Sequence, residues 1–97
     1  MNNTALRMED SHAGAVCVLS INGRIDSENA AELLDRLKKL LLSGEKTILL
    51  DFKGVLYLTS AAFRVLLVAT DEAERNSARV VLCGLLGQAT GCLDLIR

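Results

Sequence analysis

The sequence predicts an α/β layer fold: a small mixed β-sheet of about four strands, flanked by two to three helices. Short apolar segments rich in β-branched residues alternate with two longer segments in which apolar residues recur every three or four positions. The resulting order is strand, strand, helix, strand, helix, strand and a short final helix. Its two strand-helix-strand crossovers require parallel pairing and right-handed connections. With 97 residues, 51% of them apolar, we expect residues 1–97 to form a single domain.

The chain should begin with a β-hairpin. Ala15–Asn22 is rich in β-branched residues and is closed by Gly23, which is typical of a strand that ends in a turn. A preceding strand around Ala5–Glu9 would be joined to it through a loop at Ser11–Gly14.

Two amphipathic helices follow. The first is expected from Ser27, with Asp26 or Ser27 as its cap and Gly44 at its end. The second is expected to begin at Thr59 or Ser60. The residues expected to pack these helices on the sheet are Leu34, Leu37, Phe63 and Leu67.

Two further strands complete the predicted sheet. Thr47–Phe52 is too short for a helix and does not alternate, which favours a mid-sheet strand covered on both faces. Arg79–Cys83 has the same character and is ended by Gly84. The segment Gln88–Arg97 would form the short final helix, which Gly91 weakens.

Composition excludes several classes of partner. A net charge of −1 gives no basic surface for nucleic acid, and the apolar runs are too short for membrane insertion. The N-terminus lacks the pattern of a secretory signal, so we expect a cytoplasmic protein. Cys17, Cys83 and Cys92 form no close pair in the sequence and are expected to be reduced thiols without a metal.

The sequence shows no set of residues for catalysis. His12 is the single histidine and is expected to be an exposed loop residue rather than a base or ligand. The glycines do not form a phosphate-binding loop, so no cofactor is expected. Spacing alone does not exclude a catalytic pair of carboxylates. We expect the acidic residues concerned to lie instead on solvated helix faces: Asp35, Asp71, Glu72 and Glu74. We therefore expect a protein that is not an enzyme.

Two adjacent hydroxyl residues, Thr59 and Ser60, mark the start of the second helix. Capping alone would explain them, because a hydroxyl oxygen can accept a hydrogen bond from a first-turn amide. The same position also favours a phosphate, whose charge meets free amides and the positive end of the helix dipole.

The sequence resembles the STAS domains, a family named after sulphate transporters and anti-sigma factor antagonists. The resemblance covers most of the chain, in the family's order. Its four blocks are residues 19–26, 48–55, 57–67 and 79–85.

The resemblance implies a phosphorylation site. The loop of anti-sigma factor antagonists usually reads Asp-Ser-(Ser or Thr)-Gly, and its phosphorylated serine falls on Ser60, with Thr59 as the alternative acceptor. Here Thr59 replaces the Asp, Ala61 the second hydroxyl residue and Ala62 the Gly. Asp26 matches the family's acidic residue near the phosphoacceptor, although capping of the first helix explains it equally well.

The implied function is an anti-sigma factor antagonist. Unphosphorylated, it would bind a serine-kinase anti-sigma factor and release the sigma factor or another client; a serine phosphatase would reverse the phosphorylation. The alternative is a STAS scaffold subunit of a lipid-transport ATPase complex. The residues that the resemblance assigns to partner binding are Arg24, Asp26, Ser27, Thr59, Ala61, Ala62 and Arg64.

Overall fold

A computed structural model describes residues 6–84 and the backbone of residues 92–95. Its elements are β1 (Arg7–Ala13), β2 (Val16–Ile25), α1 (Ala30–Leu42), β3 (Thr47–Leu58), α2 (Ser60–Arg75), β4 (Arg79–Cys83) and β5 (Cys92–Leu95). The five strands form one sheet in the order β1-β2-β3-β4-β5. The pairs β2-β3 and β3-β4 are parallel, and the two outer pairs are antiparallel. The predicted mixed α/β architecture is confirmed, with β3 at its centre.

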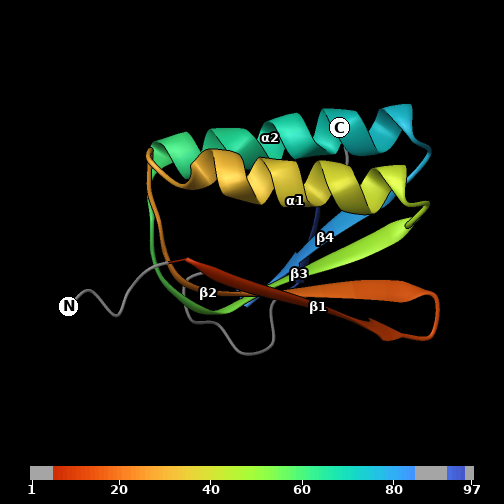
Figure 1. Ribbon diagram of the computed structural model, residues 1–97, viewed down its shortest axis with the longest axis horizontal. Helices are drawn as coiled ribbons and strands as arrows, with labels where there is room; N and C mark the ends of the chain where they lie inside the picture. The colour runs from red at the N-terminus through yellow and green to blue at the C-terminus, as the bar shows by residue number, and fades with distance from the viewer. Residues whose placement is uncertain (1–5, 85–91, 96–97) are drawn as a thin grey trace.

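Both helices lie on the same face of the sheet (Figure 1). Each crossover moves one strand along the sheet in the same direction, so two right-handed connections place both helices on one side. Along Thr47–Phe52 the residues alternate between half-buried and buried, with Ile48, Leu50 and Phe52 fully buried. The expectation that this strand is covered on both faces is therefore wrong for the described residues.

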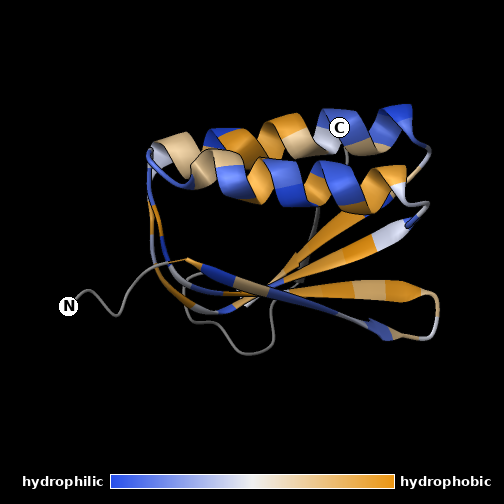
Figure 2. Cartoon of the chain, in the orientation of Figure 1, coloured by the Kyte–Doolittle hydropathy of each residue, from blue (hydrophilic) through white to orange (hydrophobic). Residues whose placement is uncertain are grey.

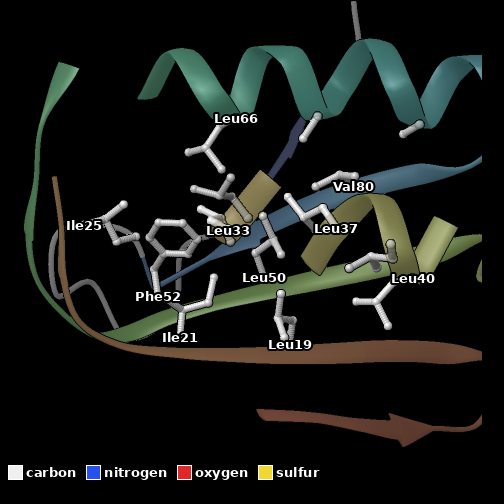
Figure 3. Close-up of a cluster of buried hydrophobic side chains, with 14 of the residues drawn as sticks. Leu19, Ile21, Ile25, Leu33, Leu37, Leu40, Leu50, Phe52, Leu66 and Val80 are labelled. Atoms are coloured by element: carbon white, nitrogen blue, oxygen red, sulfur yellow. The ribbon is translucent and has the colours of Figure 1, made fainter. Parts of the chain in front are cut away.

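The core fills the space between the helices and the sheet (Figure 3). Apolar residues predominate in β2, β3 and β4, whereas β1 is largely hydrophilic (Figure 2). The largest side chains buried there include Leu19, Ile21, Leu33, Leu50 and Phe52, all 0% exposed. Neither helix in the described ranges is long and apolar enough to cross a membrane.

The predicted packing is right for α1 and wrong for α2. Leu37 is fully buried and Leu34 is half-buried against the core. In α2, however, Phe63 is 44% exposed and Leu67 is 46% exposed. The buried face of α2 consists mainly of small residues, which allow close approach to its neighbours: Ala62, Leu66, Ala69, Thr70 and Ala73. Apolar residues on both sides of this helix made its register ambiguous in the sequence.

The hairpin is longer than predicted. Strand β1 extends to Ala13, so its turn contains Gly14 and Ala15, and Gly14 has the positive φ of 64° that such a tight turn requires. His12 is therefore an exposed strand residue and not a loop residue.

The C-terminal segment also differs from the prediction. Cys92–Leu95 pairs with β4 as a strand, where the sequence predicted a short helix. The rest of that predicted helix, residues 88–91 and 96–97, lies outside the described residues.

The cysteines differ in state. Cys17 is buried and free, as expected. Cys83 is disulfide-bonded, which corrects the expectation of three reduced thiols. Its register partner across the β4-β5 pair is Cys92. This pairing requires residues 92–95 to form a strand and not the predicted helix.

Candidate functional site

The loops that start the two helices lie side by side at one edge of the sheet. Ile25 at the end of β2 is the register partner of Leu58 at the end of β3. The backbone N–H of Thr59 also donates to the carbonyl of Ile25 at 3.1 Å. Because β2 and β3 are parallel, their carboxyl ends bring Asp26 and Ser60 to the same edge.

Two irregularities shape this edge. The β2-β3 register shifts between Ser20 and Asn22, and again between Gly23 and Arg24. Next to the first shift, Gly54 lies so close to the side chain of Asn22 that a Cβ at Gly54 would overlap it. The register shifts and this close contact determine which residues of β2 and β3 reach the edge together.

Thr59, and not Ser60, caps α2. Thr59 has extended backbone angles, and its Oγ1 accepts a hydrogen bond from the amide of Ala62 at 3.2 Å. Ser60 is the first helical residue and is exposed, whereas Thr59 is half-buried. The predicted helix start is confirmed, and the capping role is assigned to Thr59. The hydroxyl of Ser60 is therefore not needed to begin the helix.

Asp26 stabilises the turn that leads into α1. Its Oδ1 accepts hydrogen bonds from the amides of Glu28 at 2.9 Å and Asn29 at 3.1 Å, and Asn29 Oδ1 accepts from the amide of Asp26 at 2.9 Å. This reciprocal pair resembles a capping box. The N-cap residue of α1 is Asn29, and no side chain caps the helix, so the expectation that Asp26 or Ser27 caps it is wrong. Ser27 is exposed in the turn before the helix, and α1 begins at Ala30 rather than at Ser27.

Arg24 lies at the same edge, over an aromatic ring that no sequence motif had indicated. The guanidinium carbon of Arg24 is 5.1 Å from the ring centroid of Tyr57, its register partner. This is a cation–π distance. Tyr57 is 51% exposed. The sequence alone could not indicate this pair, because the contact depends on the register of β2 and β3.

The other predicted partner-binding residues do not all reach the surface. Arg64 is exposed and Ala61 is half-buried. Ala62 is 0% exposed, so its side chain belongs to the core. The structure therefore removes the Ala62 side chain from the predicted partner surface.

Ser60 begins an exposed stripe along α2. Residues separated by three, four and seven positions share one face of a helix, so Ser60, Phe63, Arg64 and Leu67 lie along one line. We call these four residues the outer stripe. It combines a hydroxyl, a cation and two apolar side chains that are each more than 40% exposed. This composition suits contact with another protein better than contact with water alone.

The start of the stripe has features that favour an anion. The amides of Ser60 and Ala61 belong to the first turn, whose N–H groups have no carbonyl partner within the helix. With the positive end of the helix dipole they favour an anion, and Arg64 lies one turn further on. The described residues that group as candidate metal ligands, His12, Cys17 and Glu45, are on other elements.

Comparison with known proteins identifies the family. The family model described as "Mlab, STAS domain" matches residues 8–97. Among solved structures, an anti-sigma factor antagonist from Mycobacterium paratuberculosis superimposes with a TM-score of 0.70 and 17% identity, over 79% of this chain and 66% of that one. A STAS domain from Rhodobacter sphaeroides, described as an anti-sigma factor antagonist, matches with a TM-score of 0.64 and 12% identity, over 89% and 91% of the chains.

A third similar structure is the phosphorylated form of SpoIIAA, a Bacillus cell fate determinant. It gives a TM-score of 0.62 and 18% identity, over 78% of this chain and 68% of that one. This chain thus spans about two thirds of two of these proteins. The structural neighbours share its fold, and the family model spans nearly all of the sequence. The chain belongs to the STAS domain family.

Proposed function

We propose that this chain is an anti-sigma factor antagonist, a protein-binding switch controlled by phosphorylation of Ser60. The proposal rests on the different roles of two neighbouring hydroxyls. Thr59 Oγ1 is engaged in capping α2, whereas the Ser60 hydroxyl is exposed at the first helical position. A kinase needs an accessible oxygen in line with the γ-phosphate of ATP, and Ser60 offers it without loss of the cap.

The proposed partner is a serine-kinase anti-sigma factor that docks on the outer stripe and the adjoining edge. Phe63 and Leu67 supply apolar area next to the acceptor hydroxyl. The neighbouring strand end contributes the cation–π pair of Arg24 and Tyr57. Arginine and aromatic residues commonly dominate the binding energy of protein interfaces. The further edge residues proposed to contact the partner are Asp26, Ser27, Thr59 and Ala61.

Phosphorylation would end this interaction through charge. A phosphoserine carries about −1.5 to −2 charges at neutral pH, and these must be desolvated if the partner is to cover them. The first-turn amides of α2 and Arg64 would hold the phosphate on the domain itself. Solved structures of SpoIIAA, one described as unphosphorylated and one as phosphorylated, share this fold and support the proposal.

The rest of the proposed cycle follows from this role. The domain provides a substrate hydroxyl and a binding surface and performs no catalysis itself. A serine phosphatase restores the unphosphorylated form. We place the switch in the cytoplasm, where sigma factors act.

A binding experiment tests the proposal. The affinity of the purified chain for serine-kinase anti-sigma factors of the source organism is measured by calorimetry with a non-hydrolysable ATP analogue. We expect Ser60→Ala to bind as tightly as the wild type and Ser60→Glu to bind at least ten-fold more weakly. The Phe63→Ala/Leu67→Ala variant should bind at least ten-fold more weakly as well.

The matched control is Leu42→Ala, which removes an 82% exposed leucine from the far end of α1 and should leave affinity unchanged. Equal affinity of the wild type and the Phe63→Ala/Leu67→Ala variant would exclude the outer stripe as the docking surface.

The second candidate is a scaffold subunit of a lipid-transport ATPase complex. The apolar part of the outer stripe favours it, because Phe63 and Leu67 could support permanent docking without phosphorylation. The same variants distinguish the two functions. A scaffold would bind the nucleotide-binding ATPase subunit through the stripe, bind no serine kinase, and incorporate no phosphate during incubation with kinase and ATP.

A further inference from the structure

Three side chains of the types that bind metal ions meet at the opposite end of the sheet from Ser60. His12 lies near the end of β1, Cys17 lies at the start of β2, and Glu45 follows α1. The helix starts and the β1-β2 turn occupy opposite ends of the molecule (Figure 1). This group is therefore separate from the proposed switch.

The backbone fixes two of the three side chains directly. His12 and Cys17 are register partners in the antiparallel β1-β2 pair, so they project to the same face of the sheet. Cys17 is 0% exposed and belongs to the core beneath the helices, whereas the His12 side chain is 51% exposed. The pair therefore extends from the core to the solvent.

The end of α1 brings in Glu45. Gly44 has a φ of 102°, and its amide donates to the carbonyl of Leu41 at 3.1 Å, while the amide of Glu45 donates to that of Leu40 at 3.2 Å. These two bonds form a Schellman motif, which fixes the direction in which the chain leaves the helix. The carboxylate of Glu45 is consequently 2.6 Å from Nε2 of His12, although 33 residues separate them.

We propose that His12 Nε2, Cys17 Sγ and a carboxylate oxygen of Glu45 bind a zinc-type divalent cation. The candidate ligand atoms of the three residues all lie within 4.8 Å of one another. In a tetrahedral zinc site, bond lengths of about 2.0 to 2.3 Å place neighbouring ligand atoms about 3.3 to 3.8 Å apart. The 2.6 Å separation between His12 Nε2 and Glu45 would widen to admit the ion, and the separations from Cys17 Sγ, which are at most 4.8 Å, lie near this range.

The donor set selects the kind of ion. One thiolate, one imidazole and one carboxylate suit Zn²⁺, whereas Mg²⁺ and Ca²⁺ prefer oxygen ligands throughout. Three protein ligands leave the fourth tetrahedral position for water.

Binding of the ion changes the protonation of two ligands. The Cys17 thiol releases its proton to solvent, and the imidazole takes the tautomer protonated at Nδ1 so that Nε2 can bind the metal. The ion thus replaces the hydrogen bond between His12 and Glu45. Burial raises the pKa of the Cys17 thiol, so the metal-free site holds a neutral sulfur.

Cobalt(II) titration of the full chain tests the proposal. Co²⁺ is the probe because a bound thiolate gives it a sulfur-to-cobalt charge-transfer band in the near ultraviolet, which zinc lacks. We expect this band to saturate at one ion per chain and to disappear when Zn²⁺ is added. Cys17→Ser should abolish the band.

His12→Ala and Glu45→Gln should each weaken Co²⁺ binding at least ten-fold. These exposed or partly exposed positions keep the test valid if the core change at Cys17 prevents folding. The controls are Glu9→Gln, on the other face of β1, Cys83→Ser and Ser60→Ala, all of which should retain the band and the affinity. A band that persists in Cys17→Ser, an unchanged affinity in both His12→Ala and Glu45→Gln, or no band at millimolar Co²⁺ would overturn the proposal.

Discussion

Replacing Thr59 and Ser60 separately by alanine should affect stability very differently, although both residues carry a hydroxyl at the start of α2. In Thr59→Ala the amide of Ala62 loses its 3.2 Å hydrogen bond to Oγ1. Loss of such a cap costs about 0.5 to 2 kcal/mol. In Ser60→Ala an exposed side chain outside the capping bond is removed, so the change should remain within about 0.5 kcal/mol.

Urea and thermal unfolding, both followed by far-ultraviolet circular dichroism, measure these changes. For a domain of this size, each kcal/mol corresponds to a shift of about 4 to 8 °C in the melting temperature. Thr59→Ala should therefore melt several degrees below the wild type, and Ser60→Ala should melt close to it. The m-value should be unchanged in both variants, because neither alters the surface exposed on unfolding. If Ser60→Ala is the more destabilised of the two, Thr59 is not the cap.

Three further predictions concern packing and charge. Leu37→Ala should lower the free energy of unfolding by about 2 to 5 kcal/mol, because this side chain is fully buried. Leu67→Ala should change it by less than about 0.5 kcal/mol, and a larger loss in urea titrations would contradict the outward orientation of Leu67 on α2. The hydrogen bond from Arg36 at 2.9 Å holds the pKa of Asp10 below its ordinary value of 3.8. The hydrogen bond therefore stabilises the folded state at pH values above the ordinary pKa of Asp10, and this contribution is lost as the pH falls through the lowered pKa. NMR titration should show Arg36→Ala raising the pKa of Asp10, and an unmoved pKa would show that the pair does not form.

Local patterns were sufficient for most of the architecture. The β-branched run before Gly23 indicated β2, and the spacing of leucines indicated α1 with its end at Gly44. The order of elements then determined the parallel pairing of β2, β3 and β4, because each crossover contains a helix. Each of these inferences depends on residues close together in the chain.

The errors arose where distant residues decide the outcome. The register of α2 depends on which of two apolar sides fits the sheet, and small alanines fit more closely than Phe63. Pairing with β4 overrode the weak helical tendency around Cys92. Neither outcome can be read from periodicity within one segment.

The candidate site was predictable in part for the same reason. The position of Ser60 at a helix start follows from local sequence and from the family resemblance. The partnership of His12 with Glu45 does not, since it requires both the hairpin register and the exit direction of α1. The cation–π pair of Arg24 and Tyr57 likewise depends on the irregular register of β2 and β3.

The most direct measurement of the central claim is the mapping of phosphate on the chain after incubation with serine-kinase anti-sigma factors of the source organism and Mg-ATP. Intact-mass spectrometry counts the phosphates, and fragmentation of the phosphopeptide assigns the residue. We predict one phosphate on Ser60, none on Ser60→Ala, and undiminished incorporation in the Leu42→Ala control. Phosphate on Thr59 alone would move the acceptor to the capping residue. Absence of phosphate from both residues, with a kinase that binds the chain, would contradict the switch.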